Sequence, residues 1–211
     1  MNPKPSLDAA YDLKTPEDSV KLYRDWAETY DDQFAEERGY TYATEVARVF
    51  AAHASGDDRP VLDIGAGTGL VGAALHEAGI GPVDALDISQ EMLDVAARKG
   101  IYKQLFCADL TAPAHFGAQQ YGGLVSAGTF THGHLGPEVL HDVVAMGKAG
   151  ALFAIGINAE HYQSRGFEEV LTSMAPGISA PELLERPIYS AADADDPHGK
   201  DTALIAVFRK R

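Results

Sequence analysis

The chain has 211 residues, and its 17 Lys and Arg stand against 31 Asp and Glu, which gives a formal net charge of −14 at pH 7. A surface this negative repels phosphate backbones, so no nucleic acid partner is expected. The sequence has no stretch of about 18 apolar residues, so no membrane partner is expected either. Residues 1–5 lack the apolar core of a secretion signal and Cys107 is the single cysteine, which together predict a cytoplasmic protein.

The N-terminal part of the chain is helical in pattern and is expected to lie outside the main core. Thr15 followed by Pro16 is typical of a helix start, because a threonine hydroxyl accepts from free backbone N–H groups and proline suits the first turn. Aromatic side chains recur at helical spacing after it, with Trp26 and Tyr30 on one broad face. A second helix is expected over residues 41–54.

Residues 56–211 are expected to fold as one unit beneath a helical lid formed by residues 1–55. Within this unit, short apolar runs alternate with helical segments, which predicts a parallel sheet covered on both faces. The expected strands are 61–65, 83–87, 103–107, 122–127 and 151–157, and the expected helices are 69–78, 90–99, 137–147 and 167–174. Two further apolar runs, 183–190 and 202–209, are joined by the polar segment 191–200 without a helix, which predicts an antiparallel pair.

The most informative motif is VLDIGAGTG at residues 61–69. An apolar strand is followed by alternating glycines that include Gly65 and Gly67, so the turn into the next helix exposes backbone N–H groups to a ligand. Asp87 ends the second apolar run, 22 residues after Gly65, and this spacing places an acid where it accepts hydrogen bonds from a nucleoside ribose. The combination predicts a cofactor that contains adenosine.

Two residues help to decide between the adenosine-containing cofactors. A dinucleotide fingerprint needs glycine at its sixth position, where this chain has Leu70. Asp63 precedes the first glycine by two residues, and its carboxylate would repel a pyrophosphate but attract a cationic ligand. S-adenosyl-L-methionine carries both an adenosine and a sulfonium. The motif resembles that of the class I S-adenosylmethionine-dependent methyltransferases, in which an acid is followed by three alternating glycines.

The resemblance implies both a fold and a set of cofactor contacts. The implied fold is an α/β, Rossmann-like, doubly wound sheet of seven strands, mostly parallel with an antiparallel last strand. Asp87 would bind the ribose hydroxyls, and Ile88 with Met92 would pack on one face of the adenine. Asp109 would accept from the exocyclic amine while the backbone of Leu110 meets the ring. Ordinary core packing of the two apolar side chains and a solvated role for Asp109 remain open.

The segment that begins at Ser126 follows the fourth strand and is expected beside the methionine portion of the cofactor. Ligands of open α/β sheets bind at the carboxyl ends of the strands, where the strand order reverses. His132 comes next and is predicted to be a general base, because a neutral imidazole can accept a proton from the methyl acceptor. No metal is expected, because no third ligand stands near His132 and His134. A histidine that only shapes the loop, and a role for Thr131 or His134 instead, remain open.

Two segments resemble the Williams-Beuren-region methyltransferase-like proteins more closely. These segments are 23–31, YRDWAETYD, and 126–134, SAGTFTHGH. In such enzymes the N-terminal helix covers the cofactor, which implies that Trp26 and Tyr30 lie over its methionine end. Aromatic faces also attract a sulfonium through the cation–π interaction. Simple packing of these aromatic side chains against the core is the alternative.

The sequence therefore predicts an enzyme that transfers a methyl group from S-adenosyl-L-methionine to a small-molecule substrate. The first alternative is a non-catalytic module that binds S-adenosylmethionine. The second is a nicotinamide-dependent oxidoreductase, which Leu70 and Asp63 disfavour.

Overall fold

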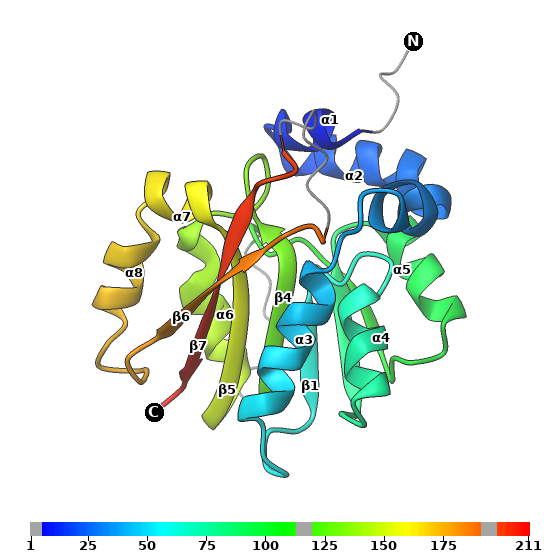
Figure 1. The fold of residues 1–211 in the computed structure, drawn as a ribbon. Coiled ribbons are helices and arrows are strands. Elements are labelled where there is room, and N and C mark those ends of the chain that lie inside the picture. The colour runs from blue at the N-terminus through cyan, green and yellow to red at the C-terminus, as the bar shows by residue number, and fades with distance from the viewer. Residues whose placement is uncertain (1–5, 113–119, 191–197) are drawn as a thin grey trace.

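The computed structural model describes residues 6–112, 120–190 and 198–211 of the chain. Within these residues a seven-stranded sheet has the order β3-β2-β1-β4-β5-β7-β6, and helices cover both of its faces (Figure 1). Strands β1 to β5 pair in parallel, whereas β7 is antiparallel to both β5 and β6. The strands are β1 (Val61–Ile64), β2 (Val83–Asp87), β3 (Leu105–Cys107), β4 (Tyr121–Phe130), β5 (Gly147–Asn158), β6 (Glu182–Pro187) and β7 (Thr202–Arg209). The predicted α/β, Rossmann-like sheet with an antiparallel last strand is confirmed.

The helices form two layers around this sheet. One face is covered by α3 and α4, which bury Phe50 and Leu75 against it, and the other by α6 and α8, which bury Val143 and Phe167. The α-helices are α1 (Leu7–Tyr11), α2 (Pro16–Trp26), α3 (Tyr42–His53), α4 (Leu70–Glu77), α5 (Gln90–Arg98), α6 (Leu140–Met146), α7 (Ala159–Ser164) and α8 (Phe167–Ser173). Short 3₁₀ segments cover Ala27–Thr29 and Pro137–Val139, and a π-helical turn covers Asp31–Glu36. No helix of the described segments is long and apolar enough to cross a bilayer.

Some elements differ in extent from their predictions. β4 continues to Phe130 rather than ending at 127, because Phe130 still pairs with Ile157 of β5. The register shifts between Ser126 and Phe130, where Gly128 has a φ of 78°. β5 begins at Gly147, where a helix was predicted to end, because Gly147 pairs with Tyr121. Most of the predicted 191–200 connection, residues 191–197, lies outside the described residues, as do residues 1–5.

The N-terminal helices lie over the edge of the sheet where the parallel strands end (Figure 1). α2 begins as predicted, since the Thr15 hydroxyl accepts from the backbone N–H of Asp18 at 3.2 Å and Pro16 occupies the first turn. The chain after α2 is tied to the core through Asp31, which accepts from the hydroxyl of Thr68 and from Lys99 Nζ. The segment from α1 to the π-helical turn therefore packs against the carboxyl ends of the strands, whereas α3, which the predicted lid of residues 1–55 included, packs on a face of the sheet.

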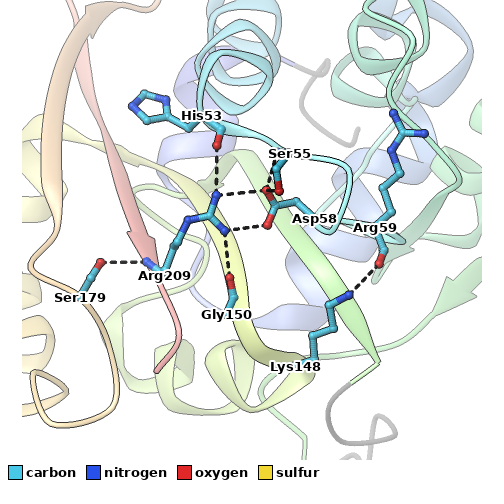
Figure 2. Close-up of polar contacts among 8 residues, drawn as sticks. All are labelled: His53, Ser55, Asp58, Arg59, Lys148, Gly150, Ser179 and Arg209. Carbon is cyan, nitrogen blue, oxygen red and sulfur yellow. Dashed lines mark hydrogen bonds and ion pairs between the residues drawn. The ribbon is translucent and has the colours of Figure 1, made fainter.

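An ion pair between Arg209 and Asp58 lies at the opposite end of the sheet, where β1 begins and β7 ends (Figure 2). The guanidinium Nη1 and Nη2 lie 2.7 and 3.1 Å from the two carboxylate oxygens, and Asp58 is only 3% exposed. The same guanidinium donates to the carbonyls of His53 and Gly150. Ser55 donates to Asp58 from both its backbone N–H and its hydroxyl. This network joins the end of β7 to the loop between α3 and β1.

Candidate cofactor and acceptor site

The turn after β1 is built from glycines in the left-handed region. Gly65, Gly67 and Gly69 have φ angles of 64°, 54° and 92°, which side chains with a Cβ rarely adopt. A Cβ at Gly65 would also collide with the hydroxyl of Thr129. At Gly67 a Cβ would meet open space, because this residue lines a cavity. The turn therefore presents main-chain atoms directly to a ligand.

Asp87 is held at the end of β2 by two backbone N–H groups. Its Oδ2 accepts from Gly67 at 2.8 Å, and its Oδ1 accepts from Ser89 at 2.8 Å. Burial raises the pKa of Asp87, and the hydrogen bonds from Ser89 and Gly67 oppose that effect. Because the first of these bonds spans the glycine turn, the turn and the acid are fixed relative to each other.

The turn and Asp87 line a cavity of about 660 Å³, which we call the cofactor cavity. This volume falls within the range of roughly 300–1,000 Å³ that is usual for sites of cofactors and other small ligands. The structure brings together here eight of the predicted cofactor-binding residues: Tyr30, Gly65, Gly67, Asp87, Ile88, Met92, Asp109 and Leu110. Trp26, Asp63, Ser126 and His132 do not line it.

One end of the cofactor cavity has the chemistry that an adenine ring requires. Ile88, Met92 and Leu110 supply apolar surface, and Met92 is only 2% exposed. Asp109 lies beside them, and its Oδ1 accepts from the backbone N–H and the hydroxyl of Thr111 at 2.8 and 2.7 Å. Those bonds orient the carboxylate and leave its other oxygen for a donor. A ring with an exocyclic amine fits this combination.

Asp63 does not face the cavity, contrary to its predicted contact with the ligand. The residue has no exposed surface, and its Oδ2 accepts from the hydroxyl of Tyr102 at 2.6 Å. Burial raises the pKa of Asp63 to about 7, although the Tyr102 hydrogen bond opposes this. As part of β1, the side chain lies beneath the glycine turn, so it supports the site from below.

Ser126 and Trp26 are also placed differently from their predicted contacts. Ser126 is fully buried and donates to the carbonyl of Ile64 at 2.8 Å, which fastens β4 to β1. The neighbouring residues 127–129 line the cavity in its place. Trp26 is 4% exposed and packs among Tyr30 and Phe34, with ring centroids 5.2 and 5.4 Å away. Trp26 therefore borders a smaller cavity beside the cofactor cavity and not the cofactor cavity itself.

A second, smaller cavity of about 60 Å³ lies beside the first, and we call it the aromatic chamber. It shares Tyr23, Tyr30, Tyr40, Gly128 and His134 with the cofactor cavity. Its other aromatic walls include Tyr11, Trp26 and Phe34. The chamber is therefore the place where the lid helices and the loop after β4 meet.

His134, and not the predicted general base His132, lies at the wall of the two cavities. The ring of His132 lies between those of Tyr11 and His161, at 5.7 and 5.2 Å, and lines neither cavity. His134 lines both cavities. The sequence suggested His134 only as an alternative, because the turn that decides which ring points inward depends on tertiary contacts.

The hydrogen bonds of His134 determine which of its nitrogens can accept a proton. Nδ1 lies 2.9 Å from the carbonyl of His132, and Nε2 lies 2.8 Å from the Tyr23 hydroxyl. Since a carbonyl only accepts, Nδ1 carries the hydrogen and Nε2 accepts from Tyr23. Burial lowers the pKa of His134, which favours the neutral imidazole. The pair can therefore receive one proton at the junction of the two cavities.

Three residues of the site were not assigned to it from the sequence: Tyr23, Tyr40 and His161. His161 follows the end of β5, is 3% exposed and lines the cofactor cavity, so a search of strand ends could have found it. The two tyrosines come from the lid, and only its docking brings them to the site. In the described parts of the chain, no group of three or more His, Cys, Asp or Glu is arranged to hold a metal ion.

The chain is similar to proteins described as methyltransferases. Residues 61–150 match a family model described as a methyltransferase domain. No curated protein matches the chain. A TehB-like S-adenosylmethionine-dependent methyltransferase from Corynebacterium glutamicum is 22% identical, with a TM-score of 0.58 over 93% of this chain and 98% of that one.

Two further solved structures have the same fold. A candidate S-adenosylmethionine-dependent methyltransferase from Methanococcus maripaludis is 17% identical, with a TM-score of 0.57 over 89% of this chain and 92% of that one. A candidate RNA methyltransferase from Pyrococcus horikoshii is 18% identical, with a TM-score of 0.61 over 80% and 82%. The fold is thus that of these methyltransferases, and residues 61–150 are similar to a methyltransferase domain.

Proposed function

We propose that this protein is an enzyme that transfers a methyl group from S-adenosyl-L-methionine to a small-molecule acceptor. The observation that carries the proposal is the position of Asp87, which two backbone N–H groups hold in the wall of a 660 Å³ cavity. A carboxylate so placed accepts from two neighbouring ribose hydroxyls. Asp109 and Leu110 lie where they would meet the adenine, and the glycine turn offers its backbone to the methionine portion.

The chain's own residues would bind, orient and shield the reactants. When bound, S-adenosylmethionine supplies an activated methyl group. The carboxylate and the glycine turn would fix its orientation, and the lid would exclude water, so most of the rate would come from positioning. His134 would take up the proton that the acceptor loses.

The acceptor is proposed to be small because the acceptor side of the cavity is covered. The lid residues Tyr23, Tyr30 and Tyr40 are only partly exposed and stand over this end of the site. A nucleic acid would also meet the charge of −14 that the whole chain carries. A small molecule can enter such a covered site, whereas a large polymer would have to displace the lid.

Calorimetry with S-adenosylmethionine and S-adenosylhomocysteine tests the cofactor directly. Both should bind the full chain and raise its melting temperature, because both should favour the folded state. Asp87→Ala should weaken binding by roughly 10- to 150-fold, which corresponds to the 1.5–3 kcal/mol of a hydrogen bond to a charged group. Asp94→Ala, an exposed carboxylate on α5 outside the cavity, is the matched control and should change nothing. Absence of binding at millimolar concentration would refute the proposal.

Two other readings give different results in the same assays. A nicotinamide-dependent oxidoreductase would bind NAD or NADP and not S-adenosylhomocysteine. A non-catalytic module would bind S-adenosylhomocysteine but transfer no label. Metabolite profiling of cells with and without the protein, supplied with a labelled methyl donor, separates this last case from an enzyme.

A further inference from the structure

We propose that the aromatic chamber is the acceptor subsite, and that it takes a compact, uncharged molecule whose hydroxyl group hydrogen-bonds to Tyr23. This inference rests on the proposed function and names the class of acceptor for the same site. It concerns the smaller cavity, whose residues have no role in holding adenosine.

The position of the chamber suits an acceptor. The two cavities share Tyr23, Tyr30, Tyr40, Gly128 and His134. A molecule in the chamber therefore meets a ligand of the cofactor cavity at these residues. Asp109 and Asp87, which would bind the adenine and the ribose, line the cofactor cavity and not the chamber.

The walls of the chamber select an uncharged molecule. Among the described residues that line it there is no Lys, Arg, Asp or Glu. A charged group placed there would lose its water without gaining an opposite charge, which is costly. Tyr11 and Tyr42 do not offer free hydroxyls either, since they donate to Asp201 and to the carbonyl of Leu204.

The volume of the chamber limits the size of the acceptor. At about 60 Å³ it is smaller than the 150 Å³ cavity that holds benzene in another protein. An aromatic ring can therefore enter the chamber only in part, and the rest of the molecule, with its hydroxyl, must lie among the residues that the two cavities share. Tyr30 and Tyr40 line that junction, and their hydroxyls make no hydrogen bond to any described residue. These groups, with the Tyr23–His134 pair, can satisfy one polar group of the acceptor.

The Tyr23–His134 pair also provides a path for the acceptor's proton. The acceptor oxygen forms a bond to the methyl carbon while the carbon–sulfur bond breaks, and that electron pair goes to the sulfur. The acceptor's proton passes to Tyr23 Oη, and the tyrosine's own proton passes to His134 Nε2, 2.8 Å away. The products are a methyl ether, a neutral thioether and an imidazolium, so atoms and charge balance.

Binding of two matched probes tests the substrate class. Phenol and 4-hydroxybenzoate carry the same nucleophile and differ by one carboxylate. In calorimetry with protein saturated with S-adenosylhomocysteine, phenol should bind more than tenfold tighter than 4-hydroxybenzoate. Ala10→Leu, which adds volume to the chamber wall, should weaken phenol binding at least tenfold and change S-adenosylhomocysteine binding less than twofold. If that variant does not fold, Ala203→Val alters the same wall from β7.

Transfer of labelled methyl to phenol tests the proton path. Tyr23→Phe removes the hydroxyl but keeps the ring, and should lower the turnover number by about 10²-fold or more while S-adenosylhomocysteine binding stays the same. Tyr162→Phe, the same change outside both cavities, is the matched control and should leave both quantities unchanged.

The possible failures are distinguishable. If S-adenosylhomocysteine does not bind, the proposed function itself fails. If it binds but phenol does not, or if 4-hydroxybenzoate binds as tightly, the acceptor class is wrong while the proposed function stands. If phenol is methylated but Tyr23→Phe leaves its methylation unchanged, the proton path is wrong. If phenol binds and no label is transferred to it, the chamber is not the acceptor subsite, and metabolite profiling with a labelled methyl donor then decides whether the proposed function stands.

Discussion

At the scale of single residues, the carboxyl group of Asp63 should make stability depend on pH in an unusual direction. Burial raises its pKa to about 7 in the folded protein, whereas an unfolded aspartate titrates near ~3.9. Between these values the folded state binds more protons than the unfolded state. The free energy of unfolding should therefore fall as pH rises from about 4 to about 7, by up to roughly 4 kcal/mol from this group alone.

The variant Asp63→Asn isolates this contribution from those of other acids. Asparagine can still accept from Tyr102 but does not titrate. The free energy of unfolding of both proteins is measured in urea at pH 5 and pH 8. Relative to the natural chain, the variant should be more stable at pH 8 than at pH 5. A gap of equal size at both values would contradict the raised pKa.

The two histidines of the loop after β4 should differ in their effect on turnover. His134→Ala should lower methyl transfer to a hydroxyl acceptor by about 10²–10⁴-fold, because it removes the proton acceptor. His132→Ala should have a much smaller effect, because the His132 ring lines neither cavity. The turnover numbers, measured with labelled S-adenosylmethionine alongside calorimetry with S-adenosylhomocysteine, check this. The reverse order of effects would restore the assignment made from the sequence.

At the scale of elements, the docking of the lid is set by a few polar contacts as well as by packing. Asp31 accepts from Thr68 in the glycine turn and from Lys99 after α5, 2.7 Å away, and Glu28 pairs with Arg98 at 2.8 Å. These contacts couple the segment that carries Tyr30 to the turn that would bind the cofactor. We therefore expect this part of the lid to become more ordered when the cofactor binds.

Hydrogen exchange with and without S-adenosylhomocysteine measures that coupling. Exchange over residues 15–35 should slow when the ligand binds, because lids are among the least stable parts of a structure. Asp31→Ala should speed exchange over residues 27–36 by roughly 2- to 10-fold, the value for one or two hydrogen bonds, and leave α3 unaffected. Equal protection in all three samples would show that packing alone holds the lid.

Most elements could be predicted because each carries its own local signal. Thr15 and Pro16 mark the beginning of α2, and Gly100, with a φ of 65°, lies just after the end of α5. The ends of β4 and β5 could not be predicted in this way. Their extra residues become strand because the two strands pair with each other, as Gly147 does with Tyr121 and Ile157 with Phe130.

At the scale of the whole molecule, the Arg209–Asp58 pair joins segments that are far apart in the chain. Arg209→Ala should lower the free energy of unfolding by about 1–3 kcal/mol, because it leaves a nearly buried carboxylate without its cation. This range lies below that for a fully buried pair because the Arg209 side chain is 41% exposed. Arg48→Ala, which breaks an exposed pair with Glu45 on α3, is the control and should cost less than about 1 kcal/mol.

Urea unfolding of both variants checks this prediction, and the cost of Arg209→Ala should shrink in acid. Burial opposes ionisation of Asp58, but the hydrogen bonds from Arg209 and Ser55 outweigh it and lower the pKa. The stability from the pair is therefore present above the pKa of an unfolded aspartate and is lost as pH falls through the lowered value. If Arg209→Ala proves no more harmful than Arg48→Ala, the pair does not hold this end of the sheet.

The sequence by itself determined the class of fold, the glycine turn and the acid that faces it. These features depend on short-range patterns: apolar runs that alternate with helices, glycines at alternate positions after the first strand, and a fixed spacing to Asp87. Tertiary structure alone decided which side chains reach the site. Asp63 and Ser126 point into the protein because of their positions in the sheet, while Tyr23 and His134 meet because the lid docks on the loop after β4. The distance between Tyr23 and His134 in the chain, 111 residues, leaves no local pattern that could have paired them.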